Sequence, residues 1–230
     1  MLISCNRVGL YNVSTQTPSV RKNDIGLMKP MGDHVIRGSK EVTGCKTHKG
    51  FNEANTSGLC KEAGTYFETE YPHQLAAMRD TERCFGVFPN KTTMGGEDGV
   101  TCSLDQSIDL GNPSHYDPMD GSPAISMWTE LEPGKASNWF FILPNIVVMY
   151  NRKLYGGLVI TLSHGTSISW DGRLVRHCTS ITYPGRLTPS TNTVPTQPNH
   201  VFGTFWAAKS MVIKCFLDKK TSGIPIQTKY

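Results

Sequence analysis

The chain has 230 residues and a formal net charge of +4, with 22 glycines, 14 prolines and only 18% charged residues. This composition disfavours a helical bundle or a coiled coil, while 38% hydrophobic and 9% aromatic residues are too many for a disordered chain. No apolar run approaches the length of a membrane span, so we expect no membrane partner. A turn-rich, mainly β domain fits best, and its modest positive charge permits contact with phosphates without requiring it.

Residues 1–65 are predicted to be a loop-rich N-terminal region, and residues 66–230 the main domain, with the whole chain treated as one domain. A supporting helix is predicted over 72–83, because proline suits a first helical turn and Leu75 and Met78 share one face. Short apolar clusters separated by turn residues predict strands, which indicate a barrel or jelly roll. The predicted strands are 84–88, 100–110, 124–129, 138–143, 158–163, 166–170, 173–179, 201–207 and 211–216.

The segment 111–120, with the sequence GNPSHYDPMD, is the most informative part of the chain. It follows a predicted strand, and residues two apart in an extended segment face the same side. His115 and Asp117 are therefore expected to project together into one cavity. The predicted strand 158–163 is followed by His164, and Arg173 comes one strand later.

Two histidines and one carboxylate can hold an octahedral ion and leave three adjacent positions open, as in non-haem Fe(II) oxygenases. Strand order favours His164 as the distal histidine, with His177 and His200 as the alternatives. His177 could equally be a core histidine beside the site. A nearby arginine such as Arg173 could hold the far carboxylate of a 2-oxo acid through two parallel hydrogen bonds. This order of groups predicts a double-stranded β-helix with the site at its mouth.

A zinc site is a further alternative, because Cys45 and His48 have the spacing of a ligand pair. Cys60 with His73 or Cys84 would have to complete it, and these residues lack ligand spacing. The seven cysteines form no regular framework, and the N-terminus has no adequate apolar signal region. We therefore expect free thiols and an intracellular protein.

The segment GNPSHYDPMD, together with NWFFIL at 138–143 and the run 157–179, resembles the TET/JBP branch of Fe(II)-dependent dioxygenases. The resemblance covers roughly residues 85–214 and is strongest to the algal and transposon-associated members. It implies a double-stranded β-helix (jelly-roll) enzyme in which His115, Asp117 and His164 hold Fe(II) for reaction with O2. It also implies that Arg173 or Arg176 anchors the co-substrate, which in most of the family is 2-oxoglutarate.

Asp120 matches a further feature of the algal members, in which an aspartate three residues after the ligand aspartate serves ascorbate in place of 2-oxoglutarate. A carboxylate here would repel a dicarboxylate but could accept hydrogen bonds from the hydroxyls of ascorbate. Asp120 could instead be a turn residue in the Asp–Gly pair that it begins. The resemblance therefore leaves the co-substrate open between 2-oxoglutarate and ascorbate.

The resemblance implies that the substrate is DNA containing 5-methylcytosine, whose methyl group is oxidised, and that the protein is nuclear or otherwise intracellular. The base would leave the duplex and enter a pocket lined by aromatic and polar side chains. Candidate pocket residues are Asn112, Ser114, Trp128 and Trp170. Trp139 and Phe141 are further aromatic candidates, but their pattern is more typical of a core.

Two other functions fit the same residues. An Fe(II) oxygenase could act on a small molecule or on a protein side chain, because the metal ligands do not specify the substrate. A jelly-roll binding or shell protein without a metal would also have this composition. In that case His115, Asp117 and His164 would not converge.

Overall fold

The computed structural model describes residues 25–35, 42–44, 53–84, 95–131, 139–180 and 201–222. More of these residues lie in strands than in helices, so the chain is mainly β, as the sequence predicts. The strands are β1 (Ile25–Val35), β2 (Val42–Gly44), β3 (Ser103–Gly111), β4 (Ala124–Glu130), β5 (Phe140–Tyr150), β6 (Lys153–Thr161), β7 (Thr166–Trp170), β8 (Cys178–Ser180) and β9 (Val201–Trp206). The helices are α1 (Glu53–Glu70), α2 (Pro72–Cys84) and α3 (Ser210–Thr221), with a short 3₁₀ helix, η4, at Gly96–Asp98.

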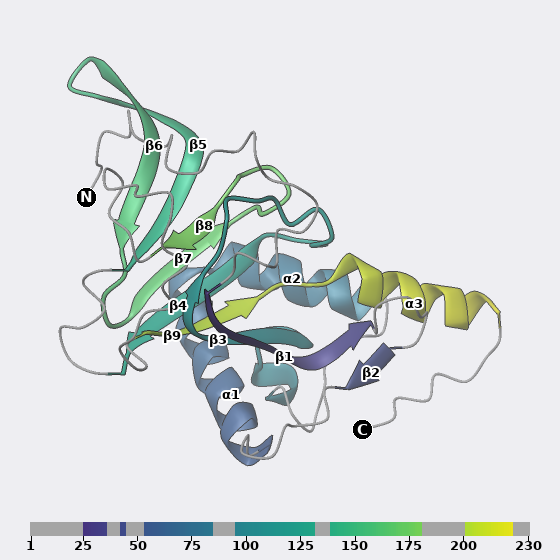
Figure 1. Cartoon of the computed structure of the whole chain (residues 1–230). Helices are drawn as coiled ribbons and strands as arrows, with labels where there is room; N and C mark the ends of the chain where they lie inside the picture. The colour runs from purple at the N-terminus through teal and green to yellow at the C-terminus, as the bar shows by residue number, and fades with distance from the viewer. Residues whose placement is uncertain are drawn as a thin grey trace.

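The strands form two antiparallel sheets (Figure 1). The larger sheet has the order β2-β1-β3-β9-β4-β7, and the smaller has the order β6-β5-β8. Beyond the end of β3 the chain pairs with the β8 segment, because the Asn112 amide donates to the Thr179 carbonyl at 3.0 Å. The segment after β3 therefore joins the two sheets. This arrangement is compatible with the predicted jelly roll.

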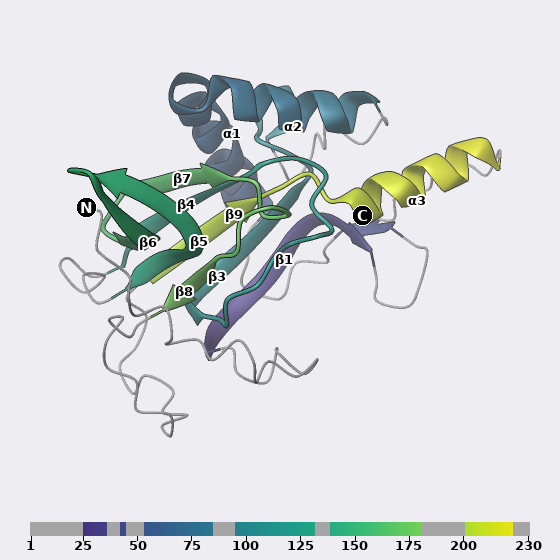
Figure 2. The ribbon, with the colours of Figure 1, turned by 90° about the horizontal axis from the view of Figure 1, so that it is seen from above.

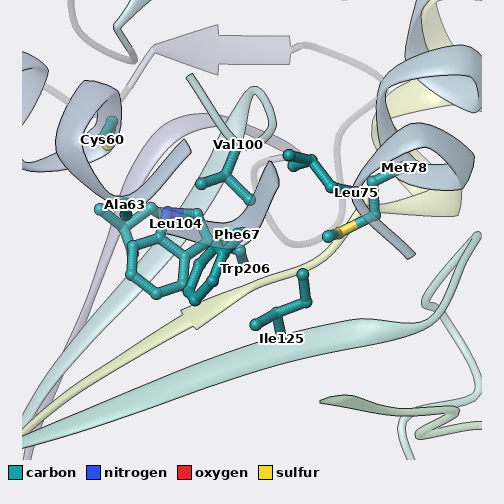
Figure 3. Close-up of a cluster of buried hydrophobic side chains, with 9 residues drawn as sticks. All are labelled: Cys60, Ala63, Phe67, Leu75, Met78, Val100, Leu104, Ile125 and Trp206. Carbon is teal, nitrogen blue, oxygen red and sulfur yellow. The ribbon is translucent and has the colours of Figure 1, made fainter. Parts of the chain in front are cut away.

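Helices α1 and α2 cover one face of the larger sheet (Figure 2). Their apolar side chains pack on that sheet in a core that includes fully buried Phe67 and Trp206, whose rings meet edge to face (Figure 3). The other members of this cluster are Cys60, Ala63, Leu75, Met78, Val100, Leu104 and Ile125.

A second core lies between the two sheets. Along β4 the side chains alternate, so that Ile125 packs in the helix-side cluster while Ala124 and Trp128 pack in this one. Trp128 and Trp170 of the larger sheet contact Phe141 of the smaller sheet, with ring centroids 5.1 and 4.8 Å away. His177 of the candidate metal centre packs against two rings of this aromatic layer, those of Phe141 and Trp170.

The structure confirms the helix predicted at 72–83 and corrects the prediction of a single helix. Helix α1 was missed because its two glycines and β-branched residues weaken the helical signal, and burial of Cys60, Ala63 and Phe67 at helical spacing supplies its stability. Helix α3 replaces the strand predicted at 211–216, because a short apolar run has no clear period.

The described part of residues 1–65 is more regular than predicted. It contains β1, β2 and most of α1, and the boundary expected after residue 65 falls inside α1. Residues 85–88, predicted as part of a strand, lie outside the described residues.

Candidate metal centre

The segment between β3 and β4 is held on both sides by backbone hydrogen bonds. On one side the Asp117 amide donates to the Gly172 carbonyl at 2.8 Å, in the turn that follows β7. On the other side the Ser210 amide donates to the Met119 carbonyl at 2.8 Å, where α3 begins. The position of this segment is thus determined by two separate parts of the chain, the turn after β7 and the start of α3.

His115, Asp117 and His177 converge in this framework. Their ligand atoms all lie within 4.8 Å of one another. The Nε2 atom of His177 is 3.0 Å from Asp117 Oδ2, and the Nε2 atom of His115 is 3.6 Å from Asp117 Oδ1. Ligands that share one ion at about 2.1 Å lie within about 4.2 Å of one another, so small side-chain rotations suffice to close the set.

Both imidazoles are oriented by the backbone. The Nδ1 atom of His115 lies 2.8 Å from the Pro113 carbonyl oxygen, and Nδ1 of His177 lies 3.1 Å from that of Val175. A carbonyl can only accept, so each Nδ1 carries a proton, and each Nε2 is directed toward Asp117, where its lone pair could bind a metal ion. Metal-binding histidines are commonly held in the same way, with the ring nitrogen that faces away from the ion donating to a backbone carbonyl.

The carboxylate between the histidines is held in its charged form. Burial raises the pKa of Asp117, but the hydrogen bond from His177 and the charges of His177, His115 and Lys209 outweigh burial and lower the pKa below its usual value. The side chains of His115 and Asp117 are 29% and 28% exposed, whereas that of His177 is 6% exposed. The cluster is thus anchored on the His177 side and open to solvent on the other, which suits an ion that must bind further ligands.

His164, the predicted distal ligand, does not join this cluster. It lies exposed in the turn before β7, whereas Asp117 contacts Gly172, beyond the other end of the same strand. At about 3.3 Å per residue, the four steps along β7 alone separate His164 from the site by about 13 Å. His177, the second candidate from the sequence, takes the expected place of the distal histidine.

Lys209 was not predicted as a site residue. Its ammonium lies 3.0 Å from Asp120 Oδ1 and 3.7 Å from Asp105 Oδ2, and 4.4 Å from the centre of the Phe205 ring. Burial lowers the pKa of Lys209, but the two carboxylates outweigh burial and raise it. The available signal was a lysine shortly after the predicted strand 201–207, and the carboxylates that it pairs with could not be read from the sequence.

Asp120 lies beside the ligand carboxylate. A Cβ atom at Gly172 would lie 3.4 Å from Asp117 Oδ2 and also 3.4 Å from Asp120 Oδ2, so both oxygens face this glycine. Burial raises the pKa of Asp120 to about 6, although Lys209 acts in the opposite direction. Asp120 Oδ2 is buried and has no hydrogen-bond partner among the described residues. A buried acceptor without a partner is costly, which is consistent with a place for a ligand group that can donate.

The two arginines predicted as anchors are engaged elsewhere. Arg173 forms a bidentate pair with Asp171, with Nη2 to Oδ2 at 2.6 Å, and its side chain is 41% exposed. The Nη2 atom of Arg176 donates to the Ser114 carbonyl at 2.8 Å, and its guanidinium lies 5.6 Å from the centre of the Tyr116 ring. Ser114 and Tyr116 flank His115, and in an extended segment they face the side opposite to the His115 ring. Their contacts with Arg176 therefore direct the guanidinium away from the cluster.

The four predicted pocket residues are all in or near the framework of the site. Asn112 accepts a hydrogen bond from the Thr179 amide at 2.8 Å, and Ser114 is fully buried next to His115. Trp128 is part of the inter-sheet core, as are Trp139 and Phe141. Trp170 packs directly against His177, with ring centroids 5.0 Å apart, and its buried Nε1 has no acceptor among the described residues.

The proposed zinc residues are not gathered where the structure describes them. Cys60 is fully buried in α1, while His73 and Cys84 are exposed on α2. Burial raises the pKa of the Cys60 thiol to about 12, which disfavours the thiolate that a metal would need. Cys45, His48 and His200 lie outside the described residues.

Comparison with known proteins adds no assignment, since no protein-family model and no curated protein matches the chain. Among the helices that the structure describes, none is both long and apolar enough to cross a membrane.

Proposed function

We propose that this protein is a mononuclear Fe(II)-dependent dioxygenase whose metal ligands are His115, Asp117 and His177. The observation that carries the proposal is the convergence of two Nε2 atoms on one half-buried carboxylate, with both Nδ1 protons directed to backbone carbonyls. This donor set fits a divalent ion of the first transition row and leaves positions for other ligands. Fe(II) bound there would supply the activation of O2.

We propose ascorbate as the co-substrate, with 2-oxoglutarate as the alternative. The cations beside the cluster that could hold a dicarboxylate are already paired: Lys209 with Asp105 and Asp120, and Arg173 with Asp171. The buried Asp120 Oδ2 lacks a donor among the described residues, and the hydroxyls of ascorbate are donors. This chemistry favours a hydroxyl-rich co-substrate over a second carboxylate.

The proposed substrate is 5-methylcytosine in DNA, whose methyl group is oxidised. This part of the proposal depends on the sequence resemblance to the TET/JBP branch. It is supported by the partly exposed side of the cluster, which leaves His115 and Asp117 accessible to an extruded base. The residues of this chain would orient the base and exclude water, with Trp170 supporting the ring of His177.

The test begins with Fe(II) titrated into metal-free protein without oxygen, followed by ascorbate or 2-oxoglutarate. We expect a charge-transfer band with ascorbate that is lost in Asp120→Ala and in His177→Ala. The complete reaction is then run on duplexes with and without 5-methylcytosine, and the nucleosides are analysed by mass spectrometry. If neither ascorbate nor 2-oxoglutarate produced a band, the oxygenase assignment would be refuted. A band without oxidation of the nucleoside would refute 5-methylcytosine as the substrate.

A further inference from the structure

The outer part of the β5–β6 hairpin extends from the body of the protein as a two-stranded ribbon (Figure 1). Strand β8 pairs with β5 only at Phe140–Ile142, and the register of β5 and β6 shifts between Leu143 and Val147. From Val147 to Leu154, each strand of the ribbon has only the other as a strand partner among the described residues. The smaller sheet does not need this extension for its core.

The tip of the ribbon is a tight, cationic turn. Tyr150 pairs with Lys153, and the two residues between them, Asn151 and Arg152, have φ values of 48° and 60°. Two successive positive φ values in a two-residue loop are typical of a type I′ turn, which matches the twist of the strands and makes the ribbon rigid. Arg152 and Lys153 are exposed, neither forms an ion pair with a described residue, and no acidic residue occurs between 143 and 161.

One face of the ribbon is apolar and open to solvent. Met149 and Leu154 lie directly opposite each other and are 71% and 70% exposed. Val147 lies on the same face, two residues before Met149, and is also exposed. Aliphatic side chains next to a cationic tip are the combination with which nucleic-acid-binding elements enter a groove: cations hold the phosphates, and apolar groups contact sugars and base edges.

The base of the ribbon is attached to the segment that carries a metal ligand. Asn145 accepts a hydrogen bond from the Arg176 amide at 3.1 Å, and Arg176 directly precedes His177. The strand from Asn145 to the tip has a length of about 20 Å. A duplex held by the ribbon would therefore lie within reach of the metal centre.

We propose that the β5–β6 ribbon enters a groove of double-stranded DNA, with Arg152 and Lys153 on phosphates and Met149 and Leu154 against the groove wall. The major groove is about 12 Å wide and admits a two-stranded ribbon. The inference rests on the proposed function, because DNA is the partner that brings a base to the metal centre. A ribbon of this kind could also contact an anionic membrane, and the test separates the two.

The experiment measures binding of the full chain to a labelled 5-methylcytosine duplex by fluorescence anisotropy, at several salt concentrations and without added iron. The double variant Arg152→Gly with Lys153→Gln removes the charges while glycine retains the positive φ. We expect about 30-fold weaker binding near 0.15 M salt and a log–log salt slope smaller in magnitude by about 2. Arg152→Lys, which keeps the charge, should bind like the wild type.

Met149→Ser with Leu154→Ser should weaken binding roughly tenfold or more while leaving the salt slope unchanged. The matched control, Lys61→Gln with Lys214→Gln, removes two exposed cations from α1 and α3 and should weaken binding much less. Vesicles with and without phosphatidylserine are tested alongside the duplex.

Equal binding by the wild type and the double-charge variant would overturn the ribbon inference, while oxidation of methylated duplex by both would leave the proposed function intact. Failure of the wild type to bind duplex, or binding to phosphatidylserine vesicles in its place, would also overturn the inference. Loss of oxidation in His177→Ala with duplex binding retained would separate the metal centre from the ribbon.

Discussion

His115 and His177 lie directly opposite each other and exchange both backbone hydrogen bonds, each 3.0 Å long. Opposed residues of an antiparallel pair project to the same face, and the two rings accordingly lie with centroids 4.5 Å apart. Asp117 lies two residues further along and faces the same side. The backbone pairing between the segment after β3 and the start of β8 thus sets the geometry of the candidate metal centre.

The first prediction concerns the identity of the distal histidine. His177→Ala is expected to weaken Fe(II) or Co(II) binding by at least about 100-fold, because it removes one of three ligands. His164→Ala is expected to leave metal affinity unchanged, because His164 is exposed beyond the far end of β7. Isothermal titration calorimetry and the visible spectrum of the Co(II) protein measure both. The reverse result, loss of binding only in His164→Ala, would show that the cluster is not the metal centre.

The second prediction concerns Gly172, which faces the carboxylates. A Cβ atom there would lie 3.1 Å from Asp117 Cβ, closer than ordinary contact, so Gly172→Ala should displace the ligand carboxylate by a few tenths of an ångström. We expect a clear loss of metal affinity, of about tenfold, with a small change in the free energy of unfolding.

Gly156→Ala is the matched control for Gly172→Ala, because a Cβ atom at Gly156 would meet nothing within 4 Å. Metal titrations and urea unfolding curves of the two variants should differ in the titrations only. Equal metal affinity of both variants would contradict the close approach at Gly172.

The sequence predicts those parts of this site that depend on neighbouring residues, and it does not predict those that depend on pairing between distant segments. His115 and Asp117 were predictable because the rule that residues two apart share a face is local. The choice between His164 and His177 depended on the register in which two segments far apart in the sequence pair with each other. That register is set by the pairing of Asn112 with Thr179 and of His115 with His177, which no local pattern indicates.

The same distinction applies to the fold. The strands at β3, β4, β7 and β9 follow from short apolar clusters between turn residues. Helix α1 has a weak local pattern and is stabilised by contacts such as that between Phe67 and Trp206, more than a hundred residues apart in the sequence. Such tertiary burial overrides local propensity and could not be predicted from the segment alone.

The third prediction concerns the buried charges beside the metal centre. Lys209→Met would leave Asp105 and Asp120 without their cation, and we expect the metal-free protein to lose about 3 kcal/mol of stability at pH 7. Lys61→Met, which breaks an exposed pair with Asp98, should cost less than about 1 kcal/mol. Urea unfolding measures both losses.

The loss in Lys209→Met should depend on pH. The folded-state pKa of Asp120, about 6 with Lys209 present, lies above the ordinary value of 3.8, so the folded state binds the proton more tightly than the unfolded state. Its contribution to stability is fully present below pH 3.8 and is lost as the pH rises through about 6. The deficit of the variant should therefore shrink as the pH falls from 7 toward 4, and a deficit that grows over this interval would contradict the account.

The fourth prediction compares two glycines of α1. A Cβ atom at Gly64 would lie 1.8 Å from the carbonyl oxygen of Asp98, at the end of η4, so the backbone must move to admit Gly64→Ala. We expect Gly64→Ala to lower the free energy of unfolding by about 2 kcal/mol or more. Gly58 is exposed in the same helix with nothing within 4 Å, so Gly58→Ala should raise it by up to about 1 kcal/mol. Thermal unfolding followed by circular dichroism measures both, and stabilisation of equal size in the two variants would show that helix propensity, rather than the close approach of α1 to η4, governs this helix.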